Sequence, residues 1–365
     1  MSPVLVLLGA GLGALALLHG ALLLHDKPRP RTPGPSPLPR QPFVSVLIPA
    51  WGEGAGVADA IRAAESLSYE PLEILVAAGG PDDTLARAKA AAGPRTRVLA
   101  QREGAGKQAA LNDVLAASKG EVLFLVDGDA TLTDAAFRET LRPVAAGEAD
   151  AATGFMRPAG GGASRGVEAY ALARGNASER FAQAGPARGL HGCNAAITRA
   201  ALERVGGFDE SARTGTDYNL AQHLLAKGQR LVLAPASVVP AQHPKRPAAF
   251  VRQQRRWLKN HLVQGKRFGQ AQDVRHYWRT ALVGLAMLAL LPAALLSPWL
   301  ALVAALLWTH ATLTRVRWFA SAAKDGLLPW HWAWVPLALA GAALDFVAWA
   351  ASLLDVATPA GRARW

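Results

Sequence analysis

Two apolar regions, one at each end of the chain, enclose a middle region that carries most of the charge. Residues Val4 to Leu24 contain no Asp, Glu, Lys or Arg, and this run is long enough to cross a bilayer as a helix. From Ala281 onward the chain becomes apolar again. A hydrophobic content of 51% with a net charge of +12 fits a chain with membrane helices, whose basic residues face anionic lipid or phosphate-bearing substrates.

The N-terminal run is expected to stay in the protein. A cleaved signal peptide is the alternative for residues 1–25, but no basic segment precedes the apolar run and no clear small-residue cleavage site follows it. Residues 26–42 are rich in proline and in basic residues, and this composition predicts an extended linker on the cytoplasmic side. The sequence therefore predicts an N-terminal transmembrane helix that anchors a cytoplasmic domain.

The C-terminal apolar region, residues 280–356, predicts about three transmembrane helices. Their expected order is a helical hairpin joined at Ser297-Pro298, a basic return loop and a last span: Ala281–Leu296 and Trp299–Leu313, then Arg315, Arg317 and Lys324, then Leu327–Leu354. One long kinked helix is the alternative to the hairpin. Placing the carboxylate of Asp345 in lipid would cost free energy, so we expect this side chain to face other helices or the interface. Residues 357–365 form a short basic tail.

The middle region, residues 43–242, alternates short apolar runs with helical stretches. This alternation predicts an open, mainly parallel α/β sheet flanked by helices. The expected strands are Phe43–Pro49, Glu73–Ala77, Arg97–Ala100 and a fourth that reaches Asp127. Ligands bind such sheets beyond the carboxyl ends of the strands, which predicts one acidic rim formed by Glu53, Asp82, Asp83, Asp127 and Asp129.

The fourth strand is followed directly by Asp127-Gly128-Asp129. Two carboxylates at the end of a buried strand suit a hard divalent cation, Mg²⁺ or Mn²⁺, that also binds a diphosphate. The alternative is an ordinary Asp-Gly turn. The single cysteine, Cys193, excludes an internal disulfide and a cysteine-based zinc cluster.

Two further polar residues each have a structural and a functional interpretation. Lys107 lacks the spacing of a P-loop, yet a lysine at the start of a helix can meet phosphate; a solvated lysine is the alternative. Asp217 lies at the start of a helix, where it is either a structural acid, at the cap or in the first turn, or a functional carboxylate.

Residues 243–279 form a basic segment with interleaved aromatic residues, including Gln253, Arg256 and Trp257. Next to membrane spans, such a segment is typical of an amphipathic helix at an anionic membrane surface. A nucleic-acid surface would share this composition, but the adjoining spans argue against a nucleic-acid partner.

In this order, the strand end Pro49-Ala50-Trp-Gly-Glu53, Asp127-x-Asp129, Thr216-Asp217 and Gln253-x-x-Arg256-Trp257 resemble the membrane-bound family 2 glycosyltransferases. The resemblance covers about residues 43–260 and implies a GT-A fold. It also implies an inverting, metal-dependent transfer from a nucleotide sugar, with UDP favoured, to a lipid-borne hydroxyl at the cytoplasmic face of a bacterial cell membrane.

The resemblance assigns roles to residues on two sides of a site. Asp217 would be the general base, and Asp129, with Asp127 as a second ligand, would hold the metal ion. The donor side would comprise Pro49, Ala50, Glu53, Asp82, Lys107, Asp127 and Asp129. The acceptor and diphosphate side would comprise His191, Gly192, Cys193, Thr216, Gln253, Arg256 and Trp257.

Two positions depart from the family pattern. The second strand ends in Gly-Gly-Pro-Asp82-Asp83 where many relatives have an Asp-Asp-x-Ser turn, and Thr216 replaces a common glutamate. Three alternatives stay open. The first is a processive polysaccharide synthase, although the chain has few C-terminal spans with which to form a secretion channel. The second is a non-catalytic membrane scaffold, which would not need the acidic residues, and the third is a nucleotidyltransferase, which would leave Gln253, Arg256 and Trp257 unexplained.

Overall fold

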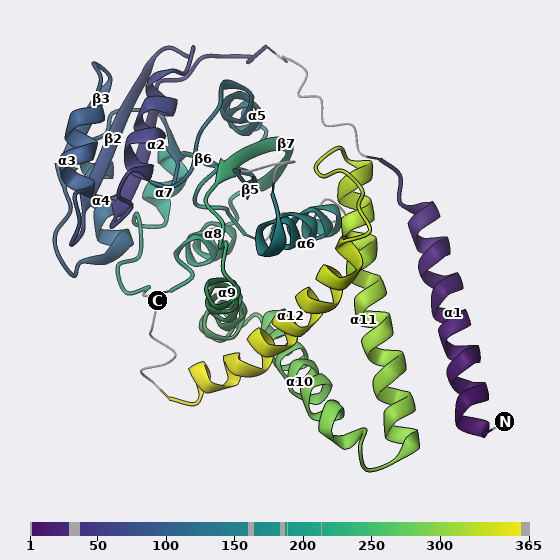
Figure 1. Cartoon of the computed structure of the whole chain (residues 1–365). Coiled ribbons are helices and arrows are strands. Elements are labelled where there is room, and N and C mark those ends of the chain that lie inside the picture. The colour runs from purple at the N-terminus through teal and green to yellow at the C-terminus, as the bar shows by residue number, and fades with distance from the viewer. Residues whose placement is uncertain are drawn as a thin grey trace. The chain divides into compact units, whose positions relative to one another are not determined.

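The computed structural model describes residues 2–28, 37–159, 164–182, 187, 189–212 and 214–358 (Figure 1). The chain forms two compact units. The sheet unit comprises residues 31–159 and 181–242, and the helical unit comprises residues 1–30, 160–180 and 243–365. The predicted domain comprises residues 43–242, and within this range residues 160–180 belong to the helical unit.

The sheet unit is built on one mixed, mainly parallel sheet of seven strands in the order β3-β2-β1-β4-β6-β5-β7. The strands are β1 (Val44–Trp51), β2 (Leu72–Gly79), β3 (Thr96–Ala100), β4 (Val122–Leu125), β5 (Ala151–Pro158), β6 (Ala195–Thr198) and β7 (Leu231–Ala241). β1 pairs in parallel with β2 and β4, whereas β6 runs antiparallel to β4 and β5. The four expected strands are all present, and β5, β6 and β7 were not expected.

Both faces of the sheet are buried, as the continuous apolar character of β1 predicts. Alternate residues of β1 enter different cores: Val46 and Ile48 pack with residues of α2 and α5, whereas Leu47 packs with residues of α4 and α8. The helices of this unit are α2 (Gly56–Glu65), α3 (Thr84–Ala91), α4 (Gly106–Ala117), α5 (Asp134–Ala145), α7 (Arg199–Arg204) and α8 (Thr216–Ala226).

The helical unit contains six helices: α1 (Pro3–His25), α6 (Gly166–Ala182), α9 (Pro247–Arg267), α10 (Ala271–Ala293), α11 (Pro298–Lys324) and α12 (Trp334–Val356). α1 and α11 lie side by side (Figure 1). His19 Nε2 is 3.1 Å from His310 Nδ1, and Arg317 donates to both carboxylate oxygens of Asp26 at 2.6 and 2.7 Å. These contacts fix the C-terminal part of α1 to the C-terminal half of α11.

Three helices in the described part of the chain, α1, α11 and α12, are long and apolar enough to cross a membrane. The chain does break at Ser297 between α10 and α11, as expected for a hairpin. α10 does not qualify as a span because its first half is polar and only about residues 281–293 are apolar. Two of the three helices, α11 and α12, lie in the C-terminal region, for which the sequence predicts about three spans.

The basic residues expected in a return loop lie instead within α11, so this helix is longer than its apolar run. Arg315 of this set points into the helical unit, where it contacts Asp345 at 2.7 Å. Asp345 is fully buried and also accepts a hydrogen bond from Tyr170 Oη of α6 at 2.6 Å. The prediction that Asp345 faces other helices is confirmed.

Two expected segments fall partly outside the described residues. Residues 29–36 of the Pro-rich linker and residues 359–365 of the basic tail are not among them.

Candidate functional site

The acidic turn after β4 is the starting point of the site. The ladder of β4 ends at Leu125, two residues earlier than expected, and Asp127 O accepts a hydrogen bond from Ala130 N at 3.1 Å. Asp127 and Asp129 therefore lie on a tight turn and not along an extended strand. The Asp-Gly turn and the acidic site are thus compatible, because the turn is what presents both side chains beyond the sheet.

Lys107 provides the positive charge that this turn needs. It lies in the first turn of α4, and its Nζ is 2.5 Å from Asp127 Oδ1. Partial burial lowers the pKa of Lys107, but the carboxylates of Asp127 and Asp217 outweigh this effect and raise the pKa above its ordinary value. The lysine is therefore held as a cation, and the interpretation as a freely solvated lysine is wrong.

Glu53 lies against the other side of the acidic turn. A methyl group at Gly128 would lie 2.8 Å from Ala50 Cβ and 3.1 Å from Glu53 Cγ, so only glycine leaves room for this approach. Burial, together with the nearby charges of Asp129 and Asp127, raises the pKa of Glu53 to about 7. The turn therefore carries more negative charge than Lys107 alone neutralises.

Asp82 connects the loops after β1 and β2. Its carboxylate accepts hydrogen bonds from Gly54 N and Thr84 N, both at 3.1 Å. The hydrogen bond with the Thr84 side chain lowers the pKa of Asp82 most, and these two backbone hydrogen bonds lower it further. The Thr84 hydroxyl also accepts from Gly54 N at 2.9 Å. Asp82 thus holds the Glu53 loop in place while its side chain remains exposed to solvent.

The segment from His191 to Asn194 reaches the same rim because β6 is antiparallel to β4. Ala195, the first residue of β6, pairs with Leu125, the last residue of β4. Hydrogen bonds from His191 N to Thr153 Oγ1 at 2.8 Å and between His191 Nδ1 and Gly154 O at 2.6 Å fix this segment to β5.

Cys193 is buried within this segment. Burial and the nearby carboxylates raise the pKa of its thiol well above the ordinary value. A thiol in this environment stays protonated and is therefore not a nucleophile.

Asp217 approaches the site from the opposite side. It lies in the first turn of α8, which begins after Gly215 in the left-handed conformation, and its carboxylate accepts from Tyr218 N at 2.9 Å. The helix is capped by Gly215 and not by Asp217. The Asp217 carboxylate uses one oxygen for this local bond, and the side chain remains only half-buried.

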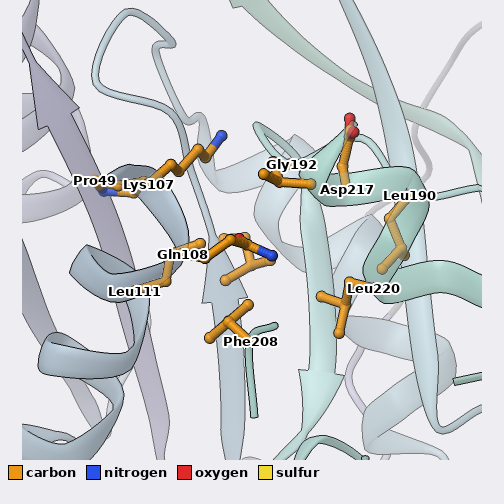
Figure 2. Close-up of a pocket in the computed structure, with 11 residues that line it drawn as sticks. Pro49, Lys107, Gln108, Leu111, Leu190, Gly192, Phe208, Asp217 and Leu220 are labelled. Carbon is orange, nitrogen blue, oxygen red and sulfur yellow. The ribbon is translucent and has the colours of Figure 1, made fainter. Parts of the chain in front are cut away.

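Gly192 lies where these groups converge. A methyl group at Gly192 would lie 3.4 Å from Lys107 Nζ, 3.7 Å from Asp217 Cβ and 4.0 Å from Asp127 Oδ1. Figure 2 shows Lys107 and Asp217 on two sides of Gly192. The missing side chain thus leaves a space bordered by the ammonium of Lys107, the carboxylate of Asp127 and the Cβ of Asp217.

A small pocket opens at this position, and it lies entirely within the sheet unit. It is lined by five predicted residues, Pro49, Lys107, Gly192, Thr216 and Asp217, and by Gln108, Leu111, Leu125, Leu190, Phe208 and Leu220, which were not predicted. Gln108 follows Lys107 directly in the first turn of a predicted helix, but an amide at that position carries no functional signal in the sequence. The apolar residues come from segments far apart in the chain, so no local sequence pattern identifies them as pocket residues.

The remaining predicted residues, Gln253, Arg256 and Trp257, lie half-buried on α9 of the helical unit. α9 is anchored there by Arg255, which donates to both oxygens of Asp355 on α12 at 3.1 and 2.6 Å. Leu258 packs with Tyr277 of α10 in the same cluster. This segment is helical and amphipathic, as expected.

The acidic turn fits a divalent cation. Among the described residues, no group of three or more His, Cys, Asp or Glu side chains is arranged as a metal cage. Burial is the largest cause of the raised pKa of Glu53, and the charges of Asp129 and Asp127 beside it raise this pKa further. Mg²⁺ is commonly held by one or two carboxylates and completed by substrate phosphates and water, and the turn offers this donor set.

Comparison with known proteins gives concordant matches. The sequence profile of the family described as "Glycosyltransferase like family 2" matches residues 39–260. Glycosyltransferase AglE from Haloferax volcanii is 26% identical over 214 residues, which are 56% of this chain and 68% of that protein. The mannosyltransferase PcManGT from Pyrobaculum calidifontis, solved in complex with GDP-Man and Mn²⁺, shares the fold with a TM-score of 0.56. Its identity is 23%, and the match covers 87% of this chain and 98% of that chain.

Proposed function

The chain belongs to glycosyltransferase-like family 2, and we propose that it moves a sugar from a nucleotide donor to a lipid-borne hydroxyl at the cytoplasmic face of a membrane. Its fold is the GT-A glycosyltransferase fold, as the resemblance implied. One observation carries the proposal: the ammonium of Lys107, the carboxylate of Asp127 and the Cβ of Asp217 all lie within 4.0 Å of a methyl group placed on Gly192.

The donor side consists of the loop after β1 and the acidic turn. Pro49, Ala50 and Glu53 line the nucleotide, with Asp82 holding their loop. Asp129, with Asp127, holds Mg²⁺ or Mn²⁺, which when bound neutralises charge on the donor diphosphate. Lys107 adds a fixed ammonium next to the same phosphates, since its pairing with Asp127 keeps it both charged and oriented.

The acceptor side consists of Asp217 and the segment from His191 to Cys193. Asp217 takes the proton from the acceptor hydroxyl as this oxygen attacks the anomeric carbon. The base and the diphosphate-binding groups lie on two sides of Gly192, an arrangement suited to in-line displacement. The reaction is therefore expected to invert the anomeric configuration.

The helical unit supports a lipid acceptor. Its apolar helices suit membrane attachment, and α9 combines Arg256 and Trp257 on a basic amphipathic helix typical of anionic lipid surfaces. Gln253, Arg256 and Trp257 are proposed to contact the acceptor and the leaving diphosphate. A UDP-linked donor is favoured by the family resemblance.

A transfer assay tests this function. The purified full-length chain is incubated with Mg²⁺ or Mn²⁺, a panel of UDP- and GDP-linked sugars and a bacterial lipid extract, and products are identified by mass. We expect one sugar added to a lipid, with the anomeric configuration inverted. A polymer would identify a processive synthase instead, and no product from any donor would leave the non-catalytic alternative.

A further inference from the structure

α12 is long and apolar enough to cross a membrane, so the position of its two ends decides whether it does. It follows α11 after residues 325–333 and so begins near the C-terminal end of α11. That end lies beside the C-terminal end of α1, because Arg317 pairs with Asp26, and Lys324 donates to Asp26 O at 2.9 Å. Since the chain continues from α1 into β1, α12 begins on the side of the membrane that holds the sheet unit.

The last turn of α12 is held by a strongly basic helix. Arg255 of α9 donates to both carboxylate oxygens of Asp355, at 3.1 and 2.6 Å, and Val356 packs against the cluster that contains Leu258. α9 carries six Lys or Arg residues, and only residues 242–246 separate it from β7. Because charged side chains are costly in hydrocarbon, α9 stays at the membrane surface on the side of β7. The end of α12 therefore lies on that side too.

The middle of α12 also contacts a charged helix. Arg174 Nε of α6 lies 3.4 Å from Asp345 Oδ1, and 24% of the Arg174 side chain is exposed. Arg180 of α6 pairs with Asp325, where the loop to α12 begins. α6 follows β5 and precedes β6 in the chain, so both its ends lead back to the sheet. The beginning, middle and end of α12 are thus all tied to segments that connect directly to the sheet.

The path of α12 leads from α11 across α10 to α9. At its start, the ring of Trp334 stacks on that of Phe319 of α11, with 5.0 Å between the ring centroids. A methyl group at Gly284 of α10 would lie 2.7 Å from Trp349 Cβ and 2.8 Å from Phe346 O of α12, so the two backbones approach closely there. Figure 1 shows α12 slanting across α10.

The face of α12 turned away from these helices is apolar. Its exposed residues lie on one side of the helix, and none of them is polar: Val335, Pro336, Leu339, Ala340, Val347 and Leu354. Trp330 and Trp332 are exposed in the loop before α12, and tryptophan is typical of the boundary between membrane and water. A helix with one apolar face and one face on charged helices is suited to lie in this boundary.

We propose that α12 does not cross the membrane but lies in its interface on the side of the sheet unit, with its apolar face in the lipid. α11 runs parallel to α1, because a methyl group at Gly11 would lie 2.7 Å from Leu306 Cδ2 and Asp26 pairs with Arg317. α11 therefore begins on the far side, to which the apolar half of α10 carries the chain. The end of α12 then lies on the side of the sheet unit.

The side on which α12 ends tests this inference. Ala357→Cys, just after α12, is compared in the full-length protein with Glu203→Cys on the exposed surface of α7 and with Ser2→Cys before α1. Inverted and right-side-out bacterial membrane vesicles are treated with a membrane-impermeant maleimide, and the wild-type protein, whose one cysteine is buried, gives the background. We expect Ala357→Cys and Glu203→Cys to be labelled from one side only, and Ser2→Cys only from the other.

Labelling of Ala357→Cys together with Ser2→Cys, or from neither side, would overturn the inference. Labelling of all three variants from one side would also overturn it, because α1 would then not cross. The inference goes beyond the proposed function and does not depend on it, since these outcomes are the same whether or not the protein transfers a sugar.

Depth in the bilayer provides a second measurement. A fluorescent maleimide is attached to Val347→Cys of α12 or to Leu307→Cys of α11, two positions that are 42% and 43% exposed. The proteins are placed in vesicles of phosphatidylethanolamine and phosphatidylglycerol that contain lipids brominated near the headgroup or at the chain end. If α12 crossed the membrane, Val347 would lie about 20 Å from its start, near the centre of the bilayer.

We expect the Val347→Cys probe to lie within about 10 Å of the headgroups and the Leu307→Cys probe to be quenched most by the lipids brominated at the chain end. Equal depths of the two probes would overturn the inference. A Val347→Cys probe that neither lipid quenches would overturn it as well, because protein, such as a second copy of the chain, would then cover the apolar face.

Discussion

Gly192 links the two sides of the site because the space above its Cα is bounded by Lys107, Asp127 and Asp217. Gly192→Ala would place a methyl group there at ordinary contact distances, so we expect the variant to fold normally. It should lower kcat/KM for transfer by about tenfold or more, because reacting groups displaced by a fraction of an ångström react poorly.

The control is Gly189→Ala in the same segment, where no heavy atom lies within 4 Å of the added carbon. It should keep wild-type activity. Full activity of Gly192→Ala, or equal losses in both variants, would contradict the account of this space.

Glu53 makes the stability of the ligand-free protein depend on pH. Its pKa of about 7 lies above the ordinary value of 4.5, so between these pH values the folded protein keeps a proton that the unfolded chain has lost. The favourable contribution is therefore complete below pH 4.5 and is lost as the pH rises through 7.

Glu53→Gln should remove this dependence and stabilise the ligand-free protein at pH 8 by about 1 kcal/mol, a figure reduced for partial contact with water. Thermal unfolding of both proteins at pH 5 and pH 8 measures the effect, and Glu203→Gln on the exposed surface of α7 is the control. If the wild-type protein became more stable relative to Glu53→Gln as the pH rose from 5 to 8, the predicted direction of the effect would be wrong.

At the residue scale, several residues that the sequence assigned to one site lie together in the structure. Lys107, Gly192, Thr216 and Asp217 come together in one pocket, as their assignment to one site required. The pairing of Lys107 with Asp127 was not predictable, because both residues had several possible partners along the rim. Gln108 escaped notice because an amide becomes informative only when its burial and lack of a partner are known.

At the scale of elements, α6 is attached to the helical unit by a buried polar cluster. Asp345 of α12 receives hydrogen bonds from Tyr170 Oη and from Arg315 of α11, and Arg174 Nε lies 3.4 Å away. The Tyr170 ring packs tightly over Gly341 of α12. Removing one partner of such a cluster leaves an uncompensated buried charge.

Asp345→Asn should therefore destabilise the detergent-solubilised protein by about 3 kcal/mol, measured as a fall in unfolding temperature. Asp355→Asn is the matched control, because Asp355 pairs with Arg255 at the partly exposed end of the same helix. It should cost about 1 kcal/mol or less. Equal effects of the two substitutions would show that burial of the cluster is not what matters.

The sequence predicted those elements that have a local signal. β1 to β4 and their helices follow from short apolar runs bounded by Gly, Pro and Asp. β5 and β6 are built from small residues such as Ala151, Ala152, Ala195 and Ala196, which are poor indicators of strands. α6 lies within the predicted domain in sequence, and its place in the helical unit depends on contacts between distant segments.

At the scale of the whole molecule, the apolar helices and the net charge of +12 suggest two ways of attaching to a membrane. Insertion of α1, α11 and α12 would resist screening by salt, whereas attachment through basic residues alone would not. We expect bacterial membranes containing the full chain to retain it in about 1 M NaCl and at alkaline carbonate pH, and to release it only with detergent. Release by salt would contradict insertion.

The central claim is that one site holds the donor on the Asp127 side and activates the acceptor with Asp217. Asp217→Asn tests it most directly, because this substitution keeps the size of the side chain and removes only the base. Donor binding by calorimetry and transfer rates are measured for this variant and for Asp59→Asn, an exposed acid of α2 that serves as the control. The account predicts a transfer rate lowered by about a thousandfold with donor affinity within about twofold of wild type. Transfer within tenfold of wild type would contradict it.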